Sequence, residues 1–226
     1  DKQTDWCSAM SVQSKPNGYV RICIDPRPLN KALQRELYKI PVLDYVLPDL
    51  AIARVFSKLD LRSGYFHCEM DERSSNLNAM ITPYGRLCWR RLPFGLNVSS
   101  EIFQKKLLQN ISDLSGVACI ADDKVVYGTG DTMEAATVKH DENLRKLLQR
   151  CREVHVRLNR EKCIFRAESI PFMGHVLTKD GLKADDSKIS AITQMHSPTC
   201  VQEVQCLQGT VGYLSRFIPG LSAIMR

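Results

Sequence analysis

Three aspartates in this chain stand where carboxylates could bind metal ions. Asp122 and Asp123 are adjacent and lie between the apolar runs GVACI and VVY, while Asp60 ends a third apolar run, VFSKL. Like charges side by side in a partly buried place raise each other's pKa unless a cation neutralises them, which favours a bound cation here. The structural alternative is an ordinary turn, in which an Asp side chain bonds nearby backbone N–H groups.

Three aspartate oxygens on two strand ends form the kind of hard ligand set that Mg²⁺ accepts. Two such ions could activate an attacking 3′-hydroxyl and stabilise a departing pyrophosphate. An EF-hand is the competing metal site, but Lys124 and Val126 occupy positions where calcium ligands belong, so the spacing excludes it.

Short β-like runs separated by turns dominate the first part of the chain and return near residue 160. A Lys-Pro-Asn-Gly turn divides residues 9–25 into two strands. Further strands or hairpins are predicted by the patterns of residues 54–61, 77–92, 157–165 and 170–184. The Asp-Asp pair lies at the tip of its own ribbon, which the apolar flanks predict to be buried on at least one face.

Helical periodicity appears in four other stretches. Residues 99–111 open on Ser99 and Ser100, which we expect to cap a helix. Residues 134–155 place an apolar stripe opposite a basic face, and residues 186–195 and 201–218 form two C-terminal helical patterns. Strands mixed with helices, without regular βαβ alternation, predict an α+β fold.

The composition is that of an ordinary globular protein with a clustered positive charge. The 226 residues are 44% hydrophobic and 25% charged, with a net charge of +6. No apolar run approaches the length of about 18 residues that a membrane span needs, so no membrane partner is expected. Nine scattered cysteines without metal spacing indicate a reduced, intracellular setting in the cytoplasm or nucleus. Clustered Lys and Arg suit a polyanionic partner, although solvated helix faces explain part of them.

The chain resembles the reverse transcriptases of gypsy-type LTR retrotransposons in a series of segments that occur in the same order: VRICIDPRPLNKAL, RVFSKLDLRSGYFHCEM, TPYGRLCWRRLPFGL, IFQKKL, IADD, RLNREKC, PFMGHVLTKDGLK and VGYLSRFIPGLS. The resemblance covers residues 5–224. It implies a right-hand polymerase fold of fingers, palm and partial thumb, in which an antiparallel palm sheet carries the Asp-Asp hairpin. The implied fingers are residues 1–40 and 68–97, truncated at their N-terminus; the palm is 41–67 and 98–180, and the thumb with the start of the connection is 181–226.

The same resemblance implies a role for individual residues. Asp60, Asp122 and Asp123 would be the catalytic, metal-binding carboxylates, with Mg²⁺ as the expected ion and Mn²⁺ as the alternative. The implied dNTP-binding residues are Lys15, Arg21, Tyr65, Phe94 and Gly95. The implied template and primer contacts are Gln104, Phe172, Met173, Gly174 and His175. A guanidinium can bind a phosphate through two parallel N–H···O hydrogen bonds, which supports the role of Arg21. The structural alternatives are a solvated cation at Arg21, a core aromatic at Tyr65 and a plain turn at Phe94 and Gly95.

Four positions depart from the family pattern. Ile120 replaces a frequent Tyr, Ser100 stands where Pro is usual, and Gln208 stands where Leu is usual. Lys124 replaces an aliphatic residue directly after the carboxylate pair. This cation could neutralise the carboxylates and compete with the metal, or its side chain could point outward to solvent.

These observations predict an RNA-directed DNA polymerase domain that adds dNTPs to a primer 3′-hydroxyl on an RNA or DNA template. RNase H and integrase regions are expected elsewhere in the parent polyprotein, and the chain is expected to begin inside that longer polypeptide. A decayed or co-opted copy that only binds nucleic acid is the main alternative. A generic α+β scaffold whose acidic turn has no chemistry is the third. The sequence does not indicate an oligomeric state.

Overall fold

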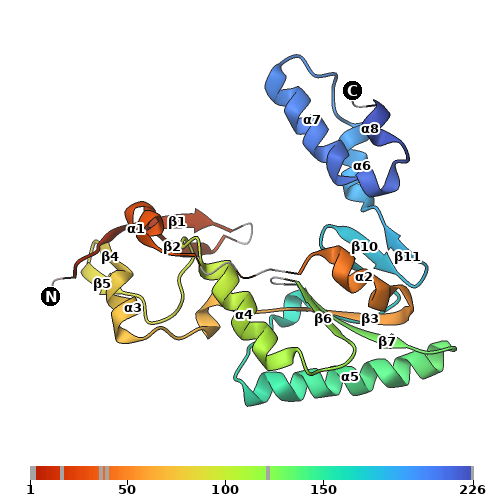
Figure 1. The fold of residues 1–226 in the computed structure, drawn as a ribbon, viewed down its shortest axis with the longest axis horizontal. Coiled ribbons are helices and arrows are strands. Elements are labelled where there is room, and N and C mark those ends of the chain that lie inside the picture. The colour runs from red at the N-terminus through yellow and green to blue at the C-terminus, as the bar shows by residue number, and fades with distance from the viewer. Residues whose placement is uncertain (1–3, 16–17, 36–37, 39–40, 121–122, 225–226) are drawn as a thin grey trace.

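Three sheets and their helices follow one another across an elongated molecule (Figure 1). The computed structural model describes residues 4–15, 18–35, 38, 41–120 and 123–224. Asp122 therefore lies outside the described residues. The mixture of antiparallel sheets and helices confirms the predicted α+β class.

The N-terminal sheet has the strand order β2-β1-β4-β5. Its strands are β1 (Ser8–Ser14), β2 (Val20–Asp25), β4 (Ala79–Thr82) and β5 (Gly85–Cys88). Helix α1 (Arg27–Ala32) follows β2, and α3 (Glu72–Leu77) precedes β4. Strands β1 and β4 run parallel, while the two hairpins β1–β2 and β4–β5 are antiparallel, so both predicted hairpins are confirmed.

The central sheet is antiparallel throughout, in the order β6-β7-β3-β8. Its strands are β6 (Val117–Ile120), β7 (Asp123–Thr129), β3 (Ala53–Asp60) and β8 (Ile164–Ala167). Helix α2 (Leu43–Ala51) leads into β3, and the 3₁₀ turn η1 (Gly64–His67) follows it. The ribbon that carries the acidic pair is thus the β6–β7 hairpin, at whose tip Asp123 begins β7.

Two long helices accompany this central sheet (Figure 1). They are α4 (Ser99–Ile111) and α5 (Met133–Glu153). The predicted apolar stripe of α5 is confirmed, because Leu147 and Cys151 are buried, together with two polar residues, His140 and Asn143. The predicted serine cap of α4 is wrong: Val98 occupies the cap position, and the Ser99 hydroxyl donates instead to the carbonyl oxygen of Pro93.

The C-terminal part contains a three-stranded antiparallel sheet and a helical group. The strands are β9 (Ser169–Phe172), β10 (His175–Thr178) and β11 (Gly181–Lys183). The 3₁₀ turn η2 (Arg160–Lys162) lies upstream of this sheet, before β8. The helical group after the sheet comprises α6 (Asp186–Thr193), α7 (Val201–Tyr213), η3 (Ser215–Phe217) and α8 (Leu221–Ile224). Figure 1 shows these helices standing away from the central sheet.

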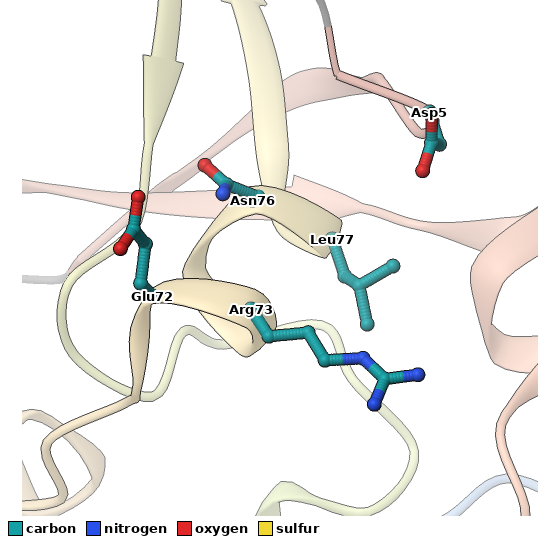
Figure 2. A pocket seen from close by; sticks show the side chains of 5 residues that line it. All are labelled: Asp5, Glu72, Arg73, Asn76 and Leu77. Atoms are coloured by element: carbon teal, nitrogen blue, oxygen red, sulfur yellow. The ribbon is translucent and has the colours of Figure 1, made fainter.

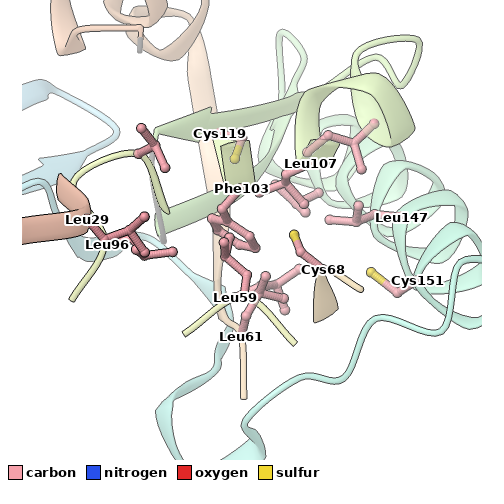
Figure 3. Close-up of a cluster of buried hydrophobic side chains, with 14 residues drawn as sticks. Leu29, Leu59, Leu61, Cys68, Leu96, Phe103, Leu107, Cys119, Leu147 and Cys151 are labelled. Atoms are coloured by element: carbon pink, nitrogen blue, oxygen red, sulfur yellow. The ribbon is translucent and has the colours of Figure 1, made fainter. Parts of the chain in front are cut away.

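The two faces of the central sheet are covered by separate hydrophobic clusters. One contains Leu59, Phe103 and Leu147 and joins β3, α4 and α5 (Figure 3). The other contains Phe56, Val125 and Phe172 and joins the central and C-terminal sheets. Leu59 of β3 belongs to the first cluster and Phe56 to the second, as expected for an odd spacing along a strand whose side chains alternate between two faces. The double cover explains why the flanks of the acidic pair are almost continuously apolar.

Two sequence expectations about bulk properties can be compared with the structure. All nine cysteines are free thiols, in agreement with the expected absence of a disulfide framework. Within the described part of the chain, no helix is long and apolar enough to cross a membrane.

Candidate catalytic site

The strand register brings two of the three predicted carboxylates together. Asp60 ends β3 and Asp123 begins β7, and the two residues are Cα partners in the antiparallel ladder. Directly opposed residues in such a ladder have Cα atoms about 4.5–5.5 Å apart and side chains on the same face. The side chains are 23% and 27% exposed, so both carboxylates are sheltered yet open to ligands. Asp122, the third predicted carboxylate, lies outside the described residues.

The backbone of Asp60 is fixed from its other side as well. The carbonyl oxygen of Asp60 accepts a hydrogen bond from the N–H of Asn159 at 2.9 Å. One residue later, Leu61 forms an isolated antiparallel bridge with Leu158. The segment before η2 therefore clamps the end of β3, and the carboxylate sits where the chain leaves the sheet.

Two lysines contact these carboxylates. The ammonium of Lys58 lies 2.8 Å from Oδ1 of Asp123, and that of Lys162 lies 3.8 Å from Oδ2 of Asp60. Lys58 precedes Asp60 by two residues in β3, so both side chains lie on one face of the strand. Sequence reasoning missed Lys58, although its two-residue spacing from Asp60 in a predicted strand was the signal that could have found it.

Lys124 takes neither a solvated nor a surface position. Its side chain is 2% exposed, and its ammonium lies 5.8 Å from the ring centroid of Phe103. Burial raises the pKa of the Cys151 thiol, and the positive charge of Lys124 partly opposes that rise. The expectation that this lysine could point outward is therefore wrong: alternation along β7 turns Lys124 into the core and Asp123 to the opposite face.

The residues present fit a divalent metal ion. Two carboxylates on one half-exposed face are hard oxygen donors of the kind that Mg²⁺ binds. The Lys58 ammonium, bound at hydrogen-bond distance to Asp123, shows that this face already attracts a cation. Among the described residues there is no group of three or more His, Cys, Asp or Glu side chains that could hold a metal ion.

Tyr65 of η1 follows Asp60 closely in the sequence and lies in an aromatic cluster. Its ring centroid is 4.7 Å from that of Phe94 and 5.5 Å from that of Phe103. Its hydroxyl lies 2.8 Å from the Ser100 hydroxyl. The Arg21 guanidinium lies over the ring of Phe94, 4.5 Å from its centroid. Three of the predicted nucleotide-binding residues are thus in one continuous set of contacts.

The LPFG loop is attached to the N-terminal sheet through its backbone. The carbonyl oxygen of Phe94 accepts a hydrogen bond from the N–H of Ile24 at 3.0 Å. Gly95 has φ +118°, and a Cβ there would stand 2.0 Å from the Ile24 carbonyl oxygen. Only glycine satisfies both the positive φ and this close approach.

Lys15, at the β1–β2 turn, donates its N–H to the Tyr19 carbonyl oxygen at 2.8 Å.

Gln104 is inside the protein. Its side chain is fully buried, and its amide nitrogen lies 3.5 Å from the Cys119 carbonyl oxygen, at the long limit for a hydrogen bond. Its Oε1 atom has no partner among the described residues. The predicted template contact stays a prediction, and this placement gives it no support.

The segment Phe172–His175 forms the tight turn between β9 and β10. Met173 and Gly174 both have positive φ, at 48° and 77°. The Tyr213 hydroxyl donates to the Met173 carbonyl oxygen at 2.8 Å, and the ring of His175 stacks on that of Tyr213 with centroids 4.8 Å apart. Burial, reinforced by the charge of Arg216, lowers the pKa of His175. Phe172 is buried in the second cluster, so the turn is exposed mainly through its tip.

A Ser-His-Asp constellation, which sequence reasoning missed, lies behind the carboxylate strand. Ser57 Oγ is 2.8 Å from His140 Nε2, and His140 Nδ1 is 3.0 Å from Asp141 Oδ1. Ser57 and His140 are fully buried. A nucleophilic serine must reach its substrate, so this set does not perform hydrolytic chemistry.

A pocket of about 540 Å³ lies elsewhere, on α3 and the N-terminal segment (Figure 2). It is lined by Asp5, Glu72, Arg73, Asn76 and Leu77. None of the predicted site residues contributes to it. Its mixed acidic and basic lining defines no ligand.

Comparison with known proteins agrees with this geometry. The profile of the reverse transcriptase (RNA-dependent DNA polymerase) family matches residues 13–177. The chain therefore belongs to the reverse transcriptase family. Among its relatives are the Retrovirus-related Pol polyproteins from the Drosophila melanogaster transposons gypsy and opus, each 32% identical over 91% and 94% of this chain. The resemblance to gypsy-type elements is confirmed. The chain spans about a fifth of these relatives' length, at 20% and 21%.

Solved structures confirm the right-hand polymerase fold. The foamy viral protease-reverse transcriptase in complex with double-stranded DNA superposes with a TM-score of 0.90 at 20% identity, over 99% of this chain and 38% of that chain. The same viral protein in complex with an RNA/DNA hybrid gives a TM-score of 0.80 at 19% identity, over 94% of this chain and 28% of that chain.

Proposed function

We propose that this chain is the polymerase domain of a retrotransposon Pol polyprotein and that it catalyses RNA-directed DNA synthesis. The observation that carries the proposal is the pairing of Asp60 with Asp123 across the central sheet, on one half-exposed face. The reaction adds a deoxynucleotide to a primer 3′-hydroxyl and releases pyrophosphate. The protein supplies no nucleophile, because the attacking hydroxyl belongs to the primer.

Asp60, Asp122 and Asp123 would hold Mg²⁺, with Mn²⁺ as the alternative ion. Bound there, the ions would supply charge stabilisation to the attacking and leaving oxygens. Asp60 and Asp123 are held by the ladder between β3 and β7, so their backbone does not have to reorganise when the substrate arrives.

The aromatic cluster is the proposed nucleotide side of the site. Tyr65 would lie under the incoming sugar and exclude a 2′-hydroxyl, and Arg21 with Lys15 would bind the triphosphate. The planar Arg21 guanidinium, 4.5 Å from the Phe94 ring centroid, presents N–H groups along its edge, which suits phosphate oxygens. Gly95 allows the close backbone approach that packs this loop on β2.

The β9–β10 turn is the proposed primer contact. Met173, Gly174 and His175 are fixed there by Tyr213, so the turn is rigid enough to aim a primer end. Phe172 anchors the turn in the core. Gln104 is left with a supporting role behind the catalytic hairpin, because its side chain is covered.

We assign the subdomains accordingly. The fingers would be residues 1–40 and 68–97, which contain the N-terminal sheet. The palm would be residues 41–67 and 98–180, which contain the central sheet and the β9–β10 turn. The thumb would be residues 181–226, which contain the group of helices α6–α8. The likeness in fold to the foamy viral enzyme supports this division.

A primer–template duplex is the proposed partner. The foamy viral relative was solved with double-stranded DNA and with an RNA/DNA hybrid. Part of the basic cluster on this chain is committed to ion pairs, since Arg150 binds Asp113 and Arg166 binds Asp141. Other basic side chains are exposed: Arg145, Lys146, Arg152, Arg157 and Arg160. RNase H and integrase regions in the parent polyprotein, and an intracellular location, complete the proposal.

Primer extension on an RNA template with Mg²⁺ or Mn²⁺ tests the function. We expect incorporation by the wild type and its loss in Asp60→Asn, Asp122→Asn and Asp123→Asn. Asp131→Asn is the matched control, because Asp131 is an exposed aspartate beyond the far end of β7. If the wild type is as inactive as the Asn variants, the proposal fails.

A gel shift with primer–template at several salt concentrations separates the alternative of a pure binding module. A basic duplex-binding surface predicts a steep linear fall of log affinity with log salt. Steep salt dependence without any extension would favour the binding module, and a flat response would contradict a nucleic-acid partner.

A further inference from the structure

The ion pair between Lys58 and Asp123 is part of the carboxylate site itself. The ammonium lies 2.8 Å from Oδ1, and the two side chains are only 18% and 27% exposed. In the β3–β7 ladder Lys58 faces Val125, so Asp123 is its diagonal neighbour on the same face as Asp60. The cation is therefore placed by the strands and not by a mobile surface loop.

The second lysine at this site is held differently. Lys162 lies on η2, is 66% exposed, and its ammonium is 3.8 Å from Asp60. An exposed pair at that distance is screened by water and salt and contributes little. Lys58 is sheltered, so its charge acts on Asp123 through a less polar surrounding. Lys124, the neighbour of Asp123 in sequence, is directed to the opposite face, toward Phe103.

We infer that Lys58 is the resident counter-cation of the carboxylate pair, and that a divalent ion must displace its ammonium from Asp123 in order to bind. This inference rests on the proposed function, because it takes Asp60 and Asp123 to be metal ligands. Lys58 thereby weakens metal binding to the free protein. The affinity for the ion becomes high only when anionic substrate phosphates add their own negative charge and oxygen ligands.

The Lys58 ammonium and a divalent ion would compete for the same atom, Asp123 Oδ1, and this competition can be tested by substitution of Lys58. Removing the ammonium while keeping the length of the side chain should free Asp123 Oδ1 and leave the strand packing intact. Lys58→Met does this, and Lys58→Gln does it with a polar end. Lys58→Arg keeps the charge and should keep the competition.

Mn²⁺ binding to the protein alone, without nucleotide or nucleic acid, is the test. The free aquo ion is followed by electron paramagnetic resonance during a titration. We expect Lys58→Met and Lys58→Gln to bind Mn²⁺ about twofold to fivefold more tightly than the wild type, the upper part of the range for a partly exposed ion pair. Lys58→Arg should stay close to the wild type. Lys139→Met is the matched control, because Lys139 pairs with Glu142 on the surface of α5, and its affinity should be unchanged.

The outcomes separate the inference from the function on which it rests. If Asp60→Asn and Asp123→Asn lose Mn²⁺ binding but both neutral Lys58 variants, folded by circular dichroism, bind no more tightly than the wild type, the counter-cation role is wrong and the metal site stands. If Mn²⁺ binding is the same in the wild type, Asp60→Asn and Asp123→Asn, the carboxylates are not the metal site and both proposals fall.

Discussion

Tyr65 makes one contact that depends on a departure from the family pattern. Its ring is held by Phe94 and Phe103, and its hydroxyl meets Ser100, which stands where Pro is usual. A proline side chain has no hydroxyl to offer. This chain therefore adds a hydrogen bond to the ring that we propose as the gate against a 2′-hydroxyl.

Removal of that hydrogen bond should weaken discrimination between dNTP and rNTP. For Ser100→Ala we expect a loss of about 0.5–1 kcal/mol, equivalent to about two- to fivefold in the ratio of the two kcat/KM values. Tyr65→Phe removes the same bond from its other end, so the double variant should show no further loss. Additive losses, or none, would contradict the proposed tether, and single-nucleotide incorporation kinetics measure all three variants.

For individual residues, the sequence indicates which acidic residues could form the site, but not which side chains lie beside them in space. The apolar runs predict Asp60 and Asp123 at strand ends, and the ladder places the two residues opposite each other. The position of Lys58 beside Asp123 depends on which residues of β3 and β7 face each other, and a single strand pattern does not contain that register. For Lys124 the outward alternative is wrong, because the side chain is buried, which is rare for a lysine.

The elements of the central sheet are tied together by a closed set of polar contacts. The N–H of Arg166 donates to Ser57 Oγ at 3.1 Å, and the Arg166 guanidinium binds Asp141 through two nitrogens. Ser57 and His140 complete the ring between β3 and α5. The register of β3 against β8 shifts at this point, between Phe56 and Lys58. A side-chain hydroxyl thus replaces a backbone partner where the strands fall out of register.

Ser57→Ala should therefore destabilise the fold without touching the surface. The buried Nε2 of His140 and the N–H of Arg166 would both lose their partner, at a cost of about 1–3 kcal/mol. Ser190→Ala on the exposed face of α6 is the control and should change stability by less than about 0.5 kcal/mol. Urea unfolding measures both, and equal midpoints for wild type and Ser57→Ala would contradict the role of this network.

Element prediction succeeded where periodicity was long and failed where it was short. The stripe of α5 was predicted, because five turns of helix give a clear period. Helices α1 and α3 have six residues each, too few for a period, and α2 contains Pro48, which argues against a helix from sequence alone. The polar ring at Ser57 was invisible, since its members lie up to 109 residues apart.

On the scale of the whole molecule, the C-terminal helices are joined to the rest through the β9–β10 turn and α2. Tyr213 and Phe217 pack on His175, and Arg216 forms an ion pair with Asp44 of α2. The Tyr213 hydroxyl occupies the space that a side chain at Gly174 would need: a Cβ there would lie 1.8 Å from it. The proposed thumb and the proposed primer contact are therefore joined by direct contacts.

Gly174→Ala should be costly for two separable reasons. Its φ of +77° strains any L-residue, and its Cβ collides with Tyr213. Gly181→Ala, with φ +116° and nothing within 4 Å of its Cβ, reports the backbone strain alone. We expect Gly174→Ala to cost about 1–3 kcal/mol more than Gly181→Ala, with part of that excess relieved in a Tyr213→Phe background. Unfolding free energies that are equal for the two glycine variants would show that the contact is absent.

The order of motifs predicted the overall architecture, and the fold comparison confirms it. What the order cannot contain is the attachment of one part to another. The ion pair between Arg216 and Asp44 joins residues 172 positions apart in the sequence. The order of the motifs does not indicate that these two residues meet.

The claim that everything else depends on is that Asp60 and the Asp122–Asp123 pair share divalent ions next to a primer end. The most direct measurement is an anomalous difference map at the manganese edge, from crystals of this chain with a dideoxy-terminated primer–template, the matching dNTP and Mn²⁺. We predict Mn²⁺ peaks bridged by the Asp60 and Asp123 carboxylates and by triphosphate oxygens, with the Lys58 ammonium withdrawn from Asp123. A correctly bound duplex and dNTP with no manganese at these carboxylates, or with Lys58 still paired to Asp123, would contradict the account.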